Sequence, residues 1–307
     1  MTRTPLAVLG LGGIGGMLAA RTEALCIGTE RTVEAIRERG LTLVEGDETR
    51  VAHPEATLRL ERPVGLLVVA VKAYDLDAAL DRIAPEPLDG AVVLPLLNGL
   101  EHVDRIRARL RAARDTVVHA PTVVAAGSIG RVSAVSPEPG VVVQAEQAGG
   151  RITAASADLD RSALAARLEP LGASGLELVV LDDEREVLWE KASRLAVLAA
   201  ATVASGLPVG ALRADPAWQG RMRAALDEAV ACAAADGVSL AAAGQWAMIE
   251  AMPPELTTSA ARDAAAGRPT ELDAIVGSVV RAAARAVVPA PSLEGLLADA
   301  EEAVRAR

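Results

Sequence analysis

The chain has 307 residues, a formal net charge of −10, one Tyr, three Trp and no Phe. The acidic surplus argues against binding to duplex nucleic acid, which needs a basic face, and the shortage of aromatic residues argues against stacking platforms for single strands. At roughly 150 residues per domain, the length predicts two domains with aliphatic cores. Cys26 and Cys232 are too far apart for a metal-site motif, so we predict two reduced core thiols and no metal.

The first half of the chain is expected to alternate buried parallel strands with helices. Continuous apolar runs, which are typical of strands buried on both faces, cover residues 6–9, 65–71 and 91–97. Helical periodicity is found at 31–39, 75–84 and 101–113, and residues 41–45 and 50–60 flank a predicted hairpin turn at 45–48. Further strand-like stretches at 116–125, 140–145, 151–155 and 177–181 surround a helix near 158–171.

From residue 184 onward the pattern is helical only. Alanine-rich helices are predicted at 184–204, 215–236, 239–251, 259–266, 271–287 and 292–305. We therefore expect an α/β fold with a doubly wound domain over 1–182, followed by an all-helical domain over 183–307. Ligands of such proteins bind outside the carboxyl ends of the strands.

Two apolar segments bear on location. The segment 195–212 is interrupted by Ser205, Gly206 and Pro208, which indicates a buried helix and its termination. An N-terminal signal peptide is the less favoured interpretation of the first apolar stretch, because five glycines break it. We predict a soluble, cytoplasmic protein with no membrane partner.

A glycine-rich loop directly follows the first predicted strand. It comprises Gly10, Leu11, Gly12, Gly13, Ile14 and Gly15, fits the pattern G-x-G-x-x-G, and opens a helix. Because backbone N–H groups at such a helix start can face a pyrophosphate, the loop predicts that the first domain is a Rossmann-like dinucleotide-binding domain. A tight structural turn is the alternative.

The second strand should end near Ile27, where the ribose of a dinucleotide would lie. No acidic residue stands directly at the strand end to bind a ribose 2′-hydroxyl, although Glu30 is close. Arg31 could instead pair with a 2′-phosphate, because a guanidinium matches phosphate geometry. We therefore favour NADP (NADPH) over NAD, with a solvated first-turn residue as the alternative for Arg31.

Lys72 and Lys191 are the only lysines, against 29 arginines, and Asn98 is the only asparagine. A lysine kept under that bias favours a function that needs a compact ammonium able to give up its proton. Lys72 and Asn98 each follow a predicted strand, so both should share one edge of the sheet with the glycine loop. Taken alone, Lys72 could be a surface lysine and Asn98-Gly99 a turn.

Lys191 lies on the first helix of the second half. Helical spacing places Leu195, Leu198, Ala199 and Thr202 on the same face. A lysine at the head of a mostly apolar stripe should be partly desolvated, which lowers its pKa toward the range of a general acid. A snorkelling lysine near Glu190 is the alternative.

Two more polar candidates lie farther along the chain. Residues 268–273 (Arg-Pro-Thr-Glu-Leu-Asp) open a predicted helix, in which Thr270 suits the N-cap position and Asp273 the N3 position. Glu271 could therefore serve only the helix dipole, and Ser259 could likewise be only a cap.

These motifs resemble the ketopantoate reductases (2-dehydropantoate 2-reductases) over essentially the whole chain. The likeness is carried by the glycine loop and by Val71-Lys72-Ala73-Tyr74, Leu97-Asn98-Gly99-Leu100, Trp189-Glu190-Lys191, Gly206-Leu207-Pro208-Val209-Gly210, and Ser259 twelve residues before Glu271. Their order and spacing together are specific, although no single motif would be.

The resemblance implies NADPH-dependent reduction of a 2-oxo acid, by default ketopantoate to pantoate in pantothenate biosynthesis. Hydride would pass to the carbonyl carbon while Lys191 protonates the developing alkoxide. Asn98 would orient the carbonyl end, Ser259 would hold the substrate carboxylate, and Glu271 would help to position the substrate and the lysine. Lys72 would lie on the side of the active site that binds the cofactor, and Asn98 would also lie next to the cofactor.

Departures from the family pattern leave the substrate and the cofactor open. The family has Asn four and eight residues after the helix lysine, both facing the substrate, where this chain has Leu195 and Ala199. The groups that select the pantoyl hydroxyl are therefore altered. The second strand also comes several residues early, and Thr29 stands where a phosphate-reading Arg is usual.

Two alternatives to a ketopantoate reductase follow. One is a family member retuned to a less polar oxo acid or an imine, with Leu195 and Ala199 in the substrate-binding set. The other is a non-catalytic nicotinamide-binding protein, against which the retention of Lys191, Glu271, Ser259 and Asn98 argues. An aliphatic helical surface in the second half could pair two chains into a homodimer, but nothing in the sequence distinguishes pairing from ordinary core.

Overall fold

The computed structural model describes residues 5–112, 121–144 and 150–306. The chain divides into two compact units. The first, the α/β unit, comprises the described residues of Met1–Leu97 and His102–Val187, and the second, the helical unit, comprises those of Asn98–Glu101 and Leu188–Arg307. The short segment Asn98–Glu101 therefore belongs to the helical unit, although the chain reaches it from the α/β unit.

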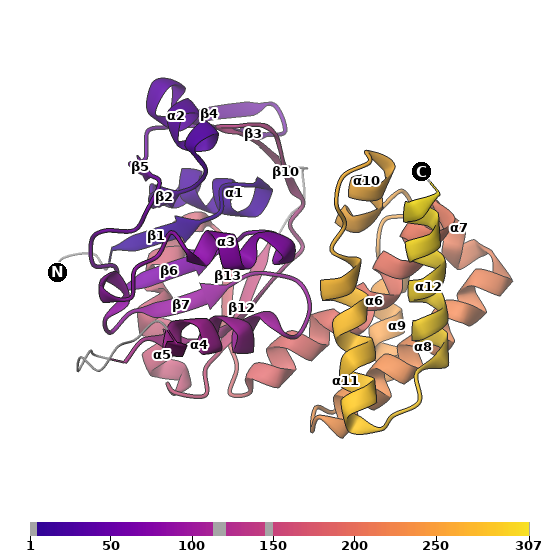
Figure 1. The fold of residues 1–307 in the computed structure, drawn as a ribbon. Helices are drawn as coiled ribbons and strands as arrows, with labels where there is room; N and C mark the ends of the chain where they lie inside the picture. The colour runs from indigo at the N-terminus through magenta and orange to yellow at the C-terminus, as the bar shows by residue number, and fades with distance from the viewer. Residues whose placement is uncertain (1–4, 113–120, 145–149, 307) are drawn as a thin grey trace. The chain divides into compact units, whose positions relative to one another are not determined.

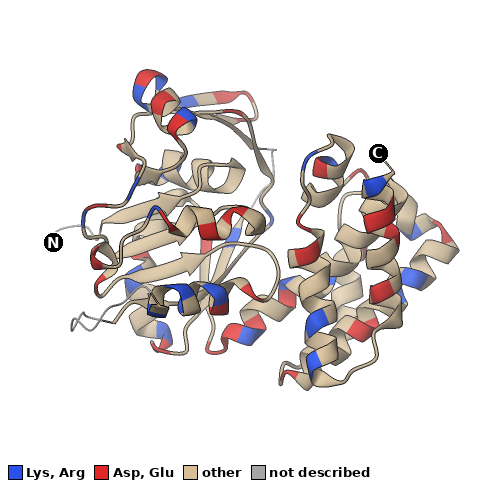
Figure 2. Cartoon of the chain, viewed as in Figure 1, with Lys and Arg blue, Asp and Glu red and all other residues tan. Residues whose placement is uncertain are grey.

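A six-stranded parallel sheet forms the centre of the α/β unit (Figure 1). The strand order is β5-β2-β1-β6-β7-β8, and the strands are β1 (Leu6–Leu9), β2 (Leu25–Ile27), β5 (Ala56–Thr57), β6 (Leu66–Val69), β7 (Val92–Pro95) and β8 (Val123–Val124). The three apolar runs form the parallel strands β1, β6 and β7, as predicted, and the structure shows that these strands are neighbours in the sheet. Figure 2 shows these strands without charged residues. The sequence order reverses between β1 and β6, and α/β proteins bind ligands at such a switch point.

Helices and two smaller sheets complete the α/β unit. The helices are α1 (Gly13–Thr22), α2 (Glu30–Arg39), α3 (Leu76–Leu80), α4 (His102–Ala112) and α5 (Arg161–Leu168). One small sheet has the order β10-β11-β3-β4 and contains β3 (Leu41–Glu45), β4 (Glu48–Ala52), β10 (Ala134–Glu138) and β11 (Val141–Gln144). The other has the order β13-β12-β9 and contains β9 (Ala126–Gly130), β12 (Arg151–Ala155) and β13 (Glu177–Val180). Strands β3 and β4 form the predicted hairpin.

Several details of the α/β unit differ from the prediction. The helix expected over 75–84 ends at Leu80, because Ile83 forms a β-bridge with Leu60. The stretch expected as one strand over 50–60 is divided between two, because β4 ends at Ala52 and Ala56–Thr57 form β5, which pairs with β2 in the central sheet. Strands β9 and β10 were not predicted, since β9 contains two glycines and β10 a proline, which obscure a strand pattern. Residues 116–120 of the strand expected over 116–125 lie outside the described residues.

The helical unit is built around the part of α6 (Glu184–Ser205) that follows Val187, and residues 196, 197 and 199–201 of this helix are fully buried. A helix that is apolar on all sides must be surrounded by other elements. Here the others are α7 (Val209–Ala214), α8 (Pro216–Ala235), α9 (Ala242–Glu250), α10 (Ser259–Ala265), α11 (Ser278–Ala286) and α12 (Pro291–Arg305). Helix α7 was not predicted as a separate element. The helix expected over 271–287 begins at Leu272, and Asp273–Gly277 form a π-helical turn before α11.

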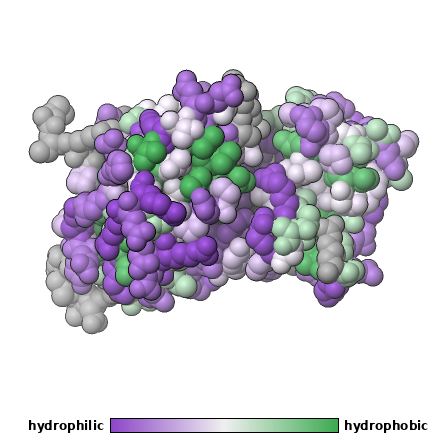
Figure 3. Space-filling view, turned by 90° about the horizontal axis from the view of Figure 1, so that it is seen from above, coloured by the Kyte–Doolittle hydropathy of each residue, from purple (hydrophilic) through white to green (hydrophobic). Residues whose placement is uncertain are grey.

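The cores of both units are aliphatic, as predicted; among the described residues, Trp189 and Trp246 are the buried Trp side chains, and Trp218 packs against the core while partly buried. Cys26 and Cys232 are free and buried, which confirms the prediction of core thiols, and burial raises the pKa of Cys26 to about 12. On the face shown in Figure 3, hydrophobic residues lie in small patches between hydrophilic ones. Within the described ranges, no helix is both long and apolar enough to cross a membrane.

Candidate active site

The glycine loop forms a tight turn between β1 and α1. Gly10 adopts a left-handed φ of +91°, and its N–H donates to the carbonyl of Ile27 at 3.0 Å. A Cβ on Gly15 would overlap the carbonyl oxygen of Gly10, so α1 can pack this closely only with glycine there. Gly12 is different, because a Cβ at that position would meet nothing within 4 Å.

The open space at Gly12 lies at the start of α1, for which Gly12 is the N-cap and whose first turn contains no acidic residue. An uncompensated helix N-terminus with accessible backbone N–H groups suits an anion. The residues present therefore fit the pyrophosphate of a dinucleotide.

Strand β2 ends at Ile27, and α2 begins after Thr29, as the sequence suggests. The hydroxyl of Thr29 lies 3.0 Å from that of Thr32, so the two side chains share a hydrogen bond at the start of the helix. Arg31 is the second residue of α2 and is exposed. Both interpretations of Arg31, a partner for a 2′-phosphate and a solvated first-turn residue, stay open.

Val71, the residue before Lys72, packs against the glycine loop. A Cβ on Gly10 would overlap the Val71 side chain and approach the carbonyl oxygen of Ala70 to 2.9 Å, so the segments after β1 and β6 pack closely. Lys72 itself is half-buried, and its carbonyl accepts from the N–H of Asp75 at 2.9 Å. The predicted proximity of Lys72 to the loop after β1 is consistent with this packing.

Lys191 and Glu271 interact within the helical unit. Burial lowers the pKa of Lys191 from 10.5 to about 8, the carboxylate of Glu271 opposes this shift, and the positive charge of Arg194 adds to it. Glu271 is only 5% exposed. A carboxylate this buried does more than favour a helix dipole at the surface, and a lysine with this pKa is suited to proton transfer near neutral pH.

The suggested capping roles of Thr270 and Ser259 were wrong. The helix begins at Leu272, so Glu271, not Thr270, occupies the N-cap position, and its carbonyl accepts from the N–H of Ile275 at 2.9 Å. The N-cap of α10 is Thr258, whose hydroxyl accepts from the N–H of Ala261 at 3.2 Å. The half-buried Ser259 is the first residue inside α10, so its hydroxyl is not needed as a cap.

The Lys191 face of α6 continues toward α10. Thr202 and Thr258 share a hydrogen bond of 2.8 Å, and Thr258 precedes Ser259. Between the two ends of this face, Leu195 packs at the edge of the core, whereas Ala199 is fully buried. Helical spacing places Lys191, Leu195, Ala199 and Thr202 on one face of α6. This face therefore runs from the Lys191–Glu271 pair at one end to the neighbourhood of Ser259 at the other.

Asn98 belongs to the same unit as Lys191, Glu271 and Ser259. It is half-buried and lies three residues after the end of β7. The site residues thus fall into two groups: Gly10–Gly15, Arg31 and Lys72 in the α/β unit, and Asn98, Lys191, Leu195, Ala199, Ser259 and Glu271 in the helical unit.

Sequence reasoning missed residues around this second group. Arg194 influences Lys191, and its position three residues along the helix was a local signal that could have revealed it. Trp189, which precedes the lysine by two positions, donates from Nε1 to Asp236 at 2.7 Å, a pairing without any local signal. The contacts of Glu101 with Arg281 and Arg285 were also missed.

Comparisons with known proteins agree with this architecture. Residues 6–158 match the family model "Ketopantoate reductase PanE/ApbA", and residues 183–302 match "Ketopantoate reductase PanE/ApbA C terminal". A 2-dehydropantoate 2-reductase from Halobacterium salinarum is 30% identical over 287 residues, with 88% of each chain covered. Another from Mesorhizobium japonicum is 27% identical and covers 95% of each chain.

Solved structures show the same fold. A PanE/ApbA family ketopantoate reductase from Ralstonia eutropha JMP134 matches with a TM-score of 0.81 and 26% identity, covering 98% of this chain and 99% of that chain. D-mandelate dehydrogenase with NADH and anilino(oxo)acetate matches with a TM-score of 0.85, covering 98% and 99% of the two chains. Its identity of 21% shows likeness of fold alone.

The parallel sheet with its glycine loop and the helical unit define a Rossmann-like oxidoreductase architecture of two parts. Both family models and the curated relatives assign the chain more narrowly. The chain belongs to the ketopantoate reductase (PanE/ApbA) family.

Proposed function

We propose that the protein is an NADPH-dependent reductase that converts a 2-oxo acid to a 2-hydroxy acid, with ketopantoate to pantoate as the default reaction. The observation that carries the proposal is the Lys191–Glu271 pair, in which burial lowers the pKa of the lysine to about 8. Reduction of a carbonyl requires a proton for the oxygen, and a lysine in this pKa range can supply it near neutral pH. Membership of the family supports the same reaction.

The residues of the helical unit have separate tasks in this reaction. A bound dihydronicotinamide supplies the hydride that reduces the carbonyl carbon. Lys191 stabilises the negative charge that develops on the carbonyl oxygen and gives up its Nζ proton to that oxygen. Glu271 favours the protonated form of Lys191 before the reaction. Asn98 orients the carbonyl, and Ser259 donates a hydrogen bond to the substrate carboxylate.

The α/β unit holds the cofactor in this proposal. Gly10, Leu11, Gly12, Gly13, Ile14 and Gly15 bind the pyrophosphate through backbone N–H groups, and the free space at Gly12 supports this role. Lys72 binds on the cofactor side, which Asn98 also borders. Arg31 pairs with the 2′-phosphate, which favours NADPH over NADH.

A different substrate is the second possibility, because Leu195 and Ala199 stand where the family pattern has amide side chains. Leu195 is half-buried at the edge of the core and presents a hydrocarbon surface instead of a hydrogen-bonding group. A site of this kind tolerates substrates that lack the pantoyl hydroxyl. The second candidate is therefore a reductase of a less polar 2-oxo acid or of an imine. A cofactor-binding protein without catalysis is a weaker alternative, since Lys191, Glu271, Ser259 and Asn98 are all present.

The proposed division of labour places cofactor binding in residues 1–182 and substrate binding and catalysis in residues 183–307, with Asn98 as the exception. The cytoplasmic location and the homodimer stay predictions.

A panel of substrates tests the proposal. The purified protein would be mixed with NADPH or NADH and with ketopantoate, 2-oxoisovalerate or bulkier 2-oxo acids, and nucleotide oxidation would be followed. Ketopantoate reduction with NADPH is the expected result. Turnover restricted to 2-oxoisovalerate or a bulkier acid would favour the retuned reductase. Tight nucleotide binding without turnover of any oxo acid or imine would favour the non-catalytic alternative.

A further inference from the structure

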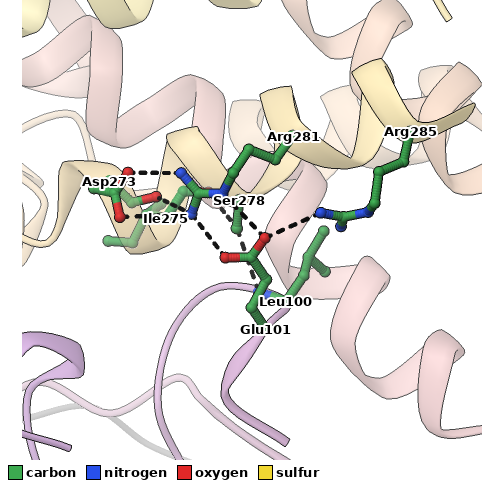
Figure 4. A network of polar contacts seen from close by, with 7 residues as sticks. All are labelled: Leu100, Glu101, Asp273, Ile275, Ser278, Arg281 and Arg285. Carbon is green, nitrogen blue, oxygen red and sulfur yellow. Dashed lines mark hydrogen bonds and ion pairs between the residues drawn. The ribbon is translucent and has the colours of Figure 1, made fainter. Parts of the chain in front are cut away.

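Arg281 joins the segment that carries Asn98 to the start of the helix that follows Glu271 (Figure 4). Its guanidinium donates to both oxygens of Glu101, from Nε to Oε1 at 3.0 Å and from Nη2 to Oε2 at 2.7 Å. Its Nη1 donates to Oδ1 of Asp273 at 2.7 Å. Two parallel bonds between a guanidinium and a carboxylate fix orientation as well as distance. The Arg281 side chain thus contacts both Glu101, three residues after Asn98, and Asp273, two residues after Glu271.

The backbone of the two segments also fits closely. Gly99 has a φ of +91°, and a Cβ there would overlap the carbonyl oxygen of Ala274 in the π-helical turn. The N–H of Leu100 donates to Oγ of Ser278 at 3.3 Å. Gly277 leaves room for the Asp273–Arg281 pair, because a Cβ on it would lie 2.8 Å from Oδ1 of Asp273 and 3.0 Å from Nη1 of Arg281. Single π-helical turns are rare and occur frequently at functional sites.

The charges in this network shift one another's pKa values. Arg281, and with it Arg285, holds the pKa of Glu101 below its usual range, and Glu101 and Asp273 raise the pKa of Arg281. The side chains of Arg281 and Glu101 are nevertheless about two-fifths exposed, at 41% and 39%. Isolated ion pairs this exposed typically add little to the free energy of unfolding, whereas bidentate and networked pairs such as these can add more. A bidentate pair that bridges two segments beside candidate site residues and fixes their relative orientation points to positioning.

We propose that Arg281 is a positioning residue that fixes Asn98 relative to Glu271 through Glu101 and Asp273. The consequence for catalysis rests on the proposed function, in which Asn98 orients the carbonyl that Lys191 protonates. Arg281 and Glu101 touch neither substrate nor cofactor in this scheme. They act through the segment Asn98–Glu101 and the π-helical turn Asp273–Gly277.

The test compares Arg281→Met, Glu101→Gln and the double variant with the wild-type protein. Because small displacements of orienting groups reduce turnover strongly, kcat should fall about tenfold to a hundredfold, while KM for NADPH stays unchanged. The double variant should lose no more than either single variant, since both remove the same link. Arg281→Lys should rescue kcat only in part, because an ammonium cannot reproduce the fork that binds Glu101 while also reaching Asp273.

Arg221→Met is the matched control. Arg221 is similarly exposed, at 43%, and forms an ion pair with Asp299 on another helix of the same unit, away from the candidate site residues in sequence. It should change kcat less than about twofold, as surface substitutions usually have small effects. An unchanged kcat in Arg281→Met, or an equal loss in Arg221→Met, would overturn the proposal.

Hydrogen exchange separates this proposal from the proposed function. Amide exchange of peptides that contain residues 98–101 should become faster in Arg281→Met and stay unchanged in Arg221→Met. If the wild-type protein reduces no 2-oxo acid, the proposed function fails, and faster exchange still supports the anchoring role. Unchanged exchange in Arg281→Met would overturn that role whatever the activity.

Discussion

The carboxylate of Glu271 and the ammonium of Lys191 interact inside the helical unit, where Glu271 is almost completely buried. The two residues come from different helical segments, α6 and the start of the helix that contains the π-helical turn. Burial and Arg194 disfavour the lysine's positive charge, whereas Glu271 favours it. This balance gives Lys191 a pKa in a range that suits reversible proton transfer, and it makes the behaviour of the site testable by pH.

Activity should fall at alkaline pH as Lys191 loses its proton. Its pKa is lowered to about 8, and the protonated form is the proton donor, so kcat/KM should decline as the pH rises through about 8. Glu271→Gln removes the charge that raises the pKa of Lys191, so the decline should begin at lower pH. Arg194→Gln removes a charge that lowers this pKa, so the decline should begin at higher pH. Identical profiles for wild type and both variants would contradict the assignment of this limb to Lys191.

Gly12 and Gly15 should respond differently to replacement by alanine. A methyl group at Gly12 meets nothing within 4 Å, so Gly12→Ala should fold normally but bind the nicotinamide dinucleotide weakly, since the methyl group occupies the space for the pyrophosphate. Gly15→Ala would overlap the Gly10 carbonyl and should destabilise the α/β unit by about 1–3 kcal/mol, as overpacking does. Thermal unfolding and fluorescence titration with NADPH distinguish the two effects. Undiminished NADPH affinity in Gly12→Ala would contradict the site.

Leu195→Asn should restore discrimination for a hydroxylated substrate. If the residue faces the substrate, a new hydrogen bond should raise the kcat/KM ratio of ketopantoate to 2-oxoisovalerate about three- to tenfold. Leu195→Met, which adds no polar group, serves as the control and should leave the ratio close to that of the wild type. A ratio unaffected by Leu195→Asn would remove Leu195 from the substrate-binding set.

Arg31→Ala tests the cofactor preference. Loss of a guanidinium that pairs with the 2′-phosphate should lower kcat/KM for NADPH about tenfold and leave the value for NADH nearly unchanged. Arg39 lies at the other end of α2 and is also exposed, so Arg39→Ala is a suitable control. Equal effects of Arg31→Ala on both nucleotides would favour the solvated first-turn interpretation.

The predictable parts of the fold have local signals. The apolar runs that form β1, β6 and β7 and the glycines that shape the following loop are contiguous in sequence, so the central strands and the dinucleotide-binding turn could be predicted. The helical pattern after residue 183 was equally readable, apart from α7. Strands β9 and β10 carry no apolar alternation, and their pairing with β12 and β11 gives them their structure.

The candidate site was predictable only in its residue types. Hydroxyl residues are adjacent at 257–259, and the sequence does not say that Thr258, not Ser259, caps α10. The hydrogen bonds between Arg281 and Glu101 join residues that are 180 positions apart in the sequence, and no sequence periodicity links the two positions. The π-helical turn that brings Ala274 against Gly99 has no sequence pattern of its own. Arrangements of this kind depend on tertiary packing, which overrides local propensity.

The role of Lys191 as proton donor is tested by kcat for 2-oxo acid reduction by wild type, Lys191→Ala and Lys191→Arg at saturating NADPH. Loss of the proton donor should reduce kcat about 10²–10⁴-fold in Lys191→Ala, while the Kd for NADPH stays nearly unchanged. Lys191→Arg keeps the charge but cannot give up its proton at neutral pH, so it should be nearly as inactive. Wild-type turnover that persists undiminished in Lys191→Ala would contradict the account.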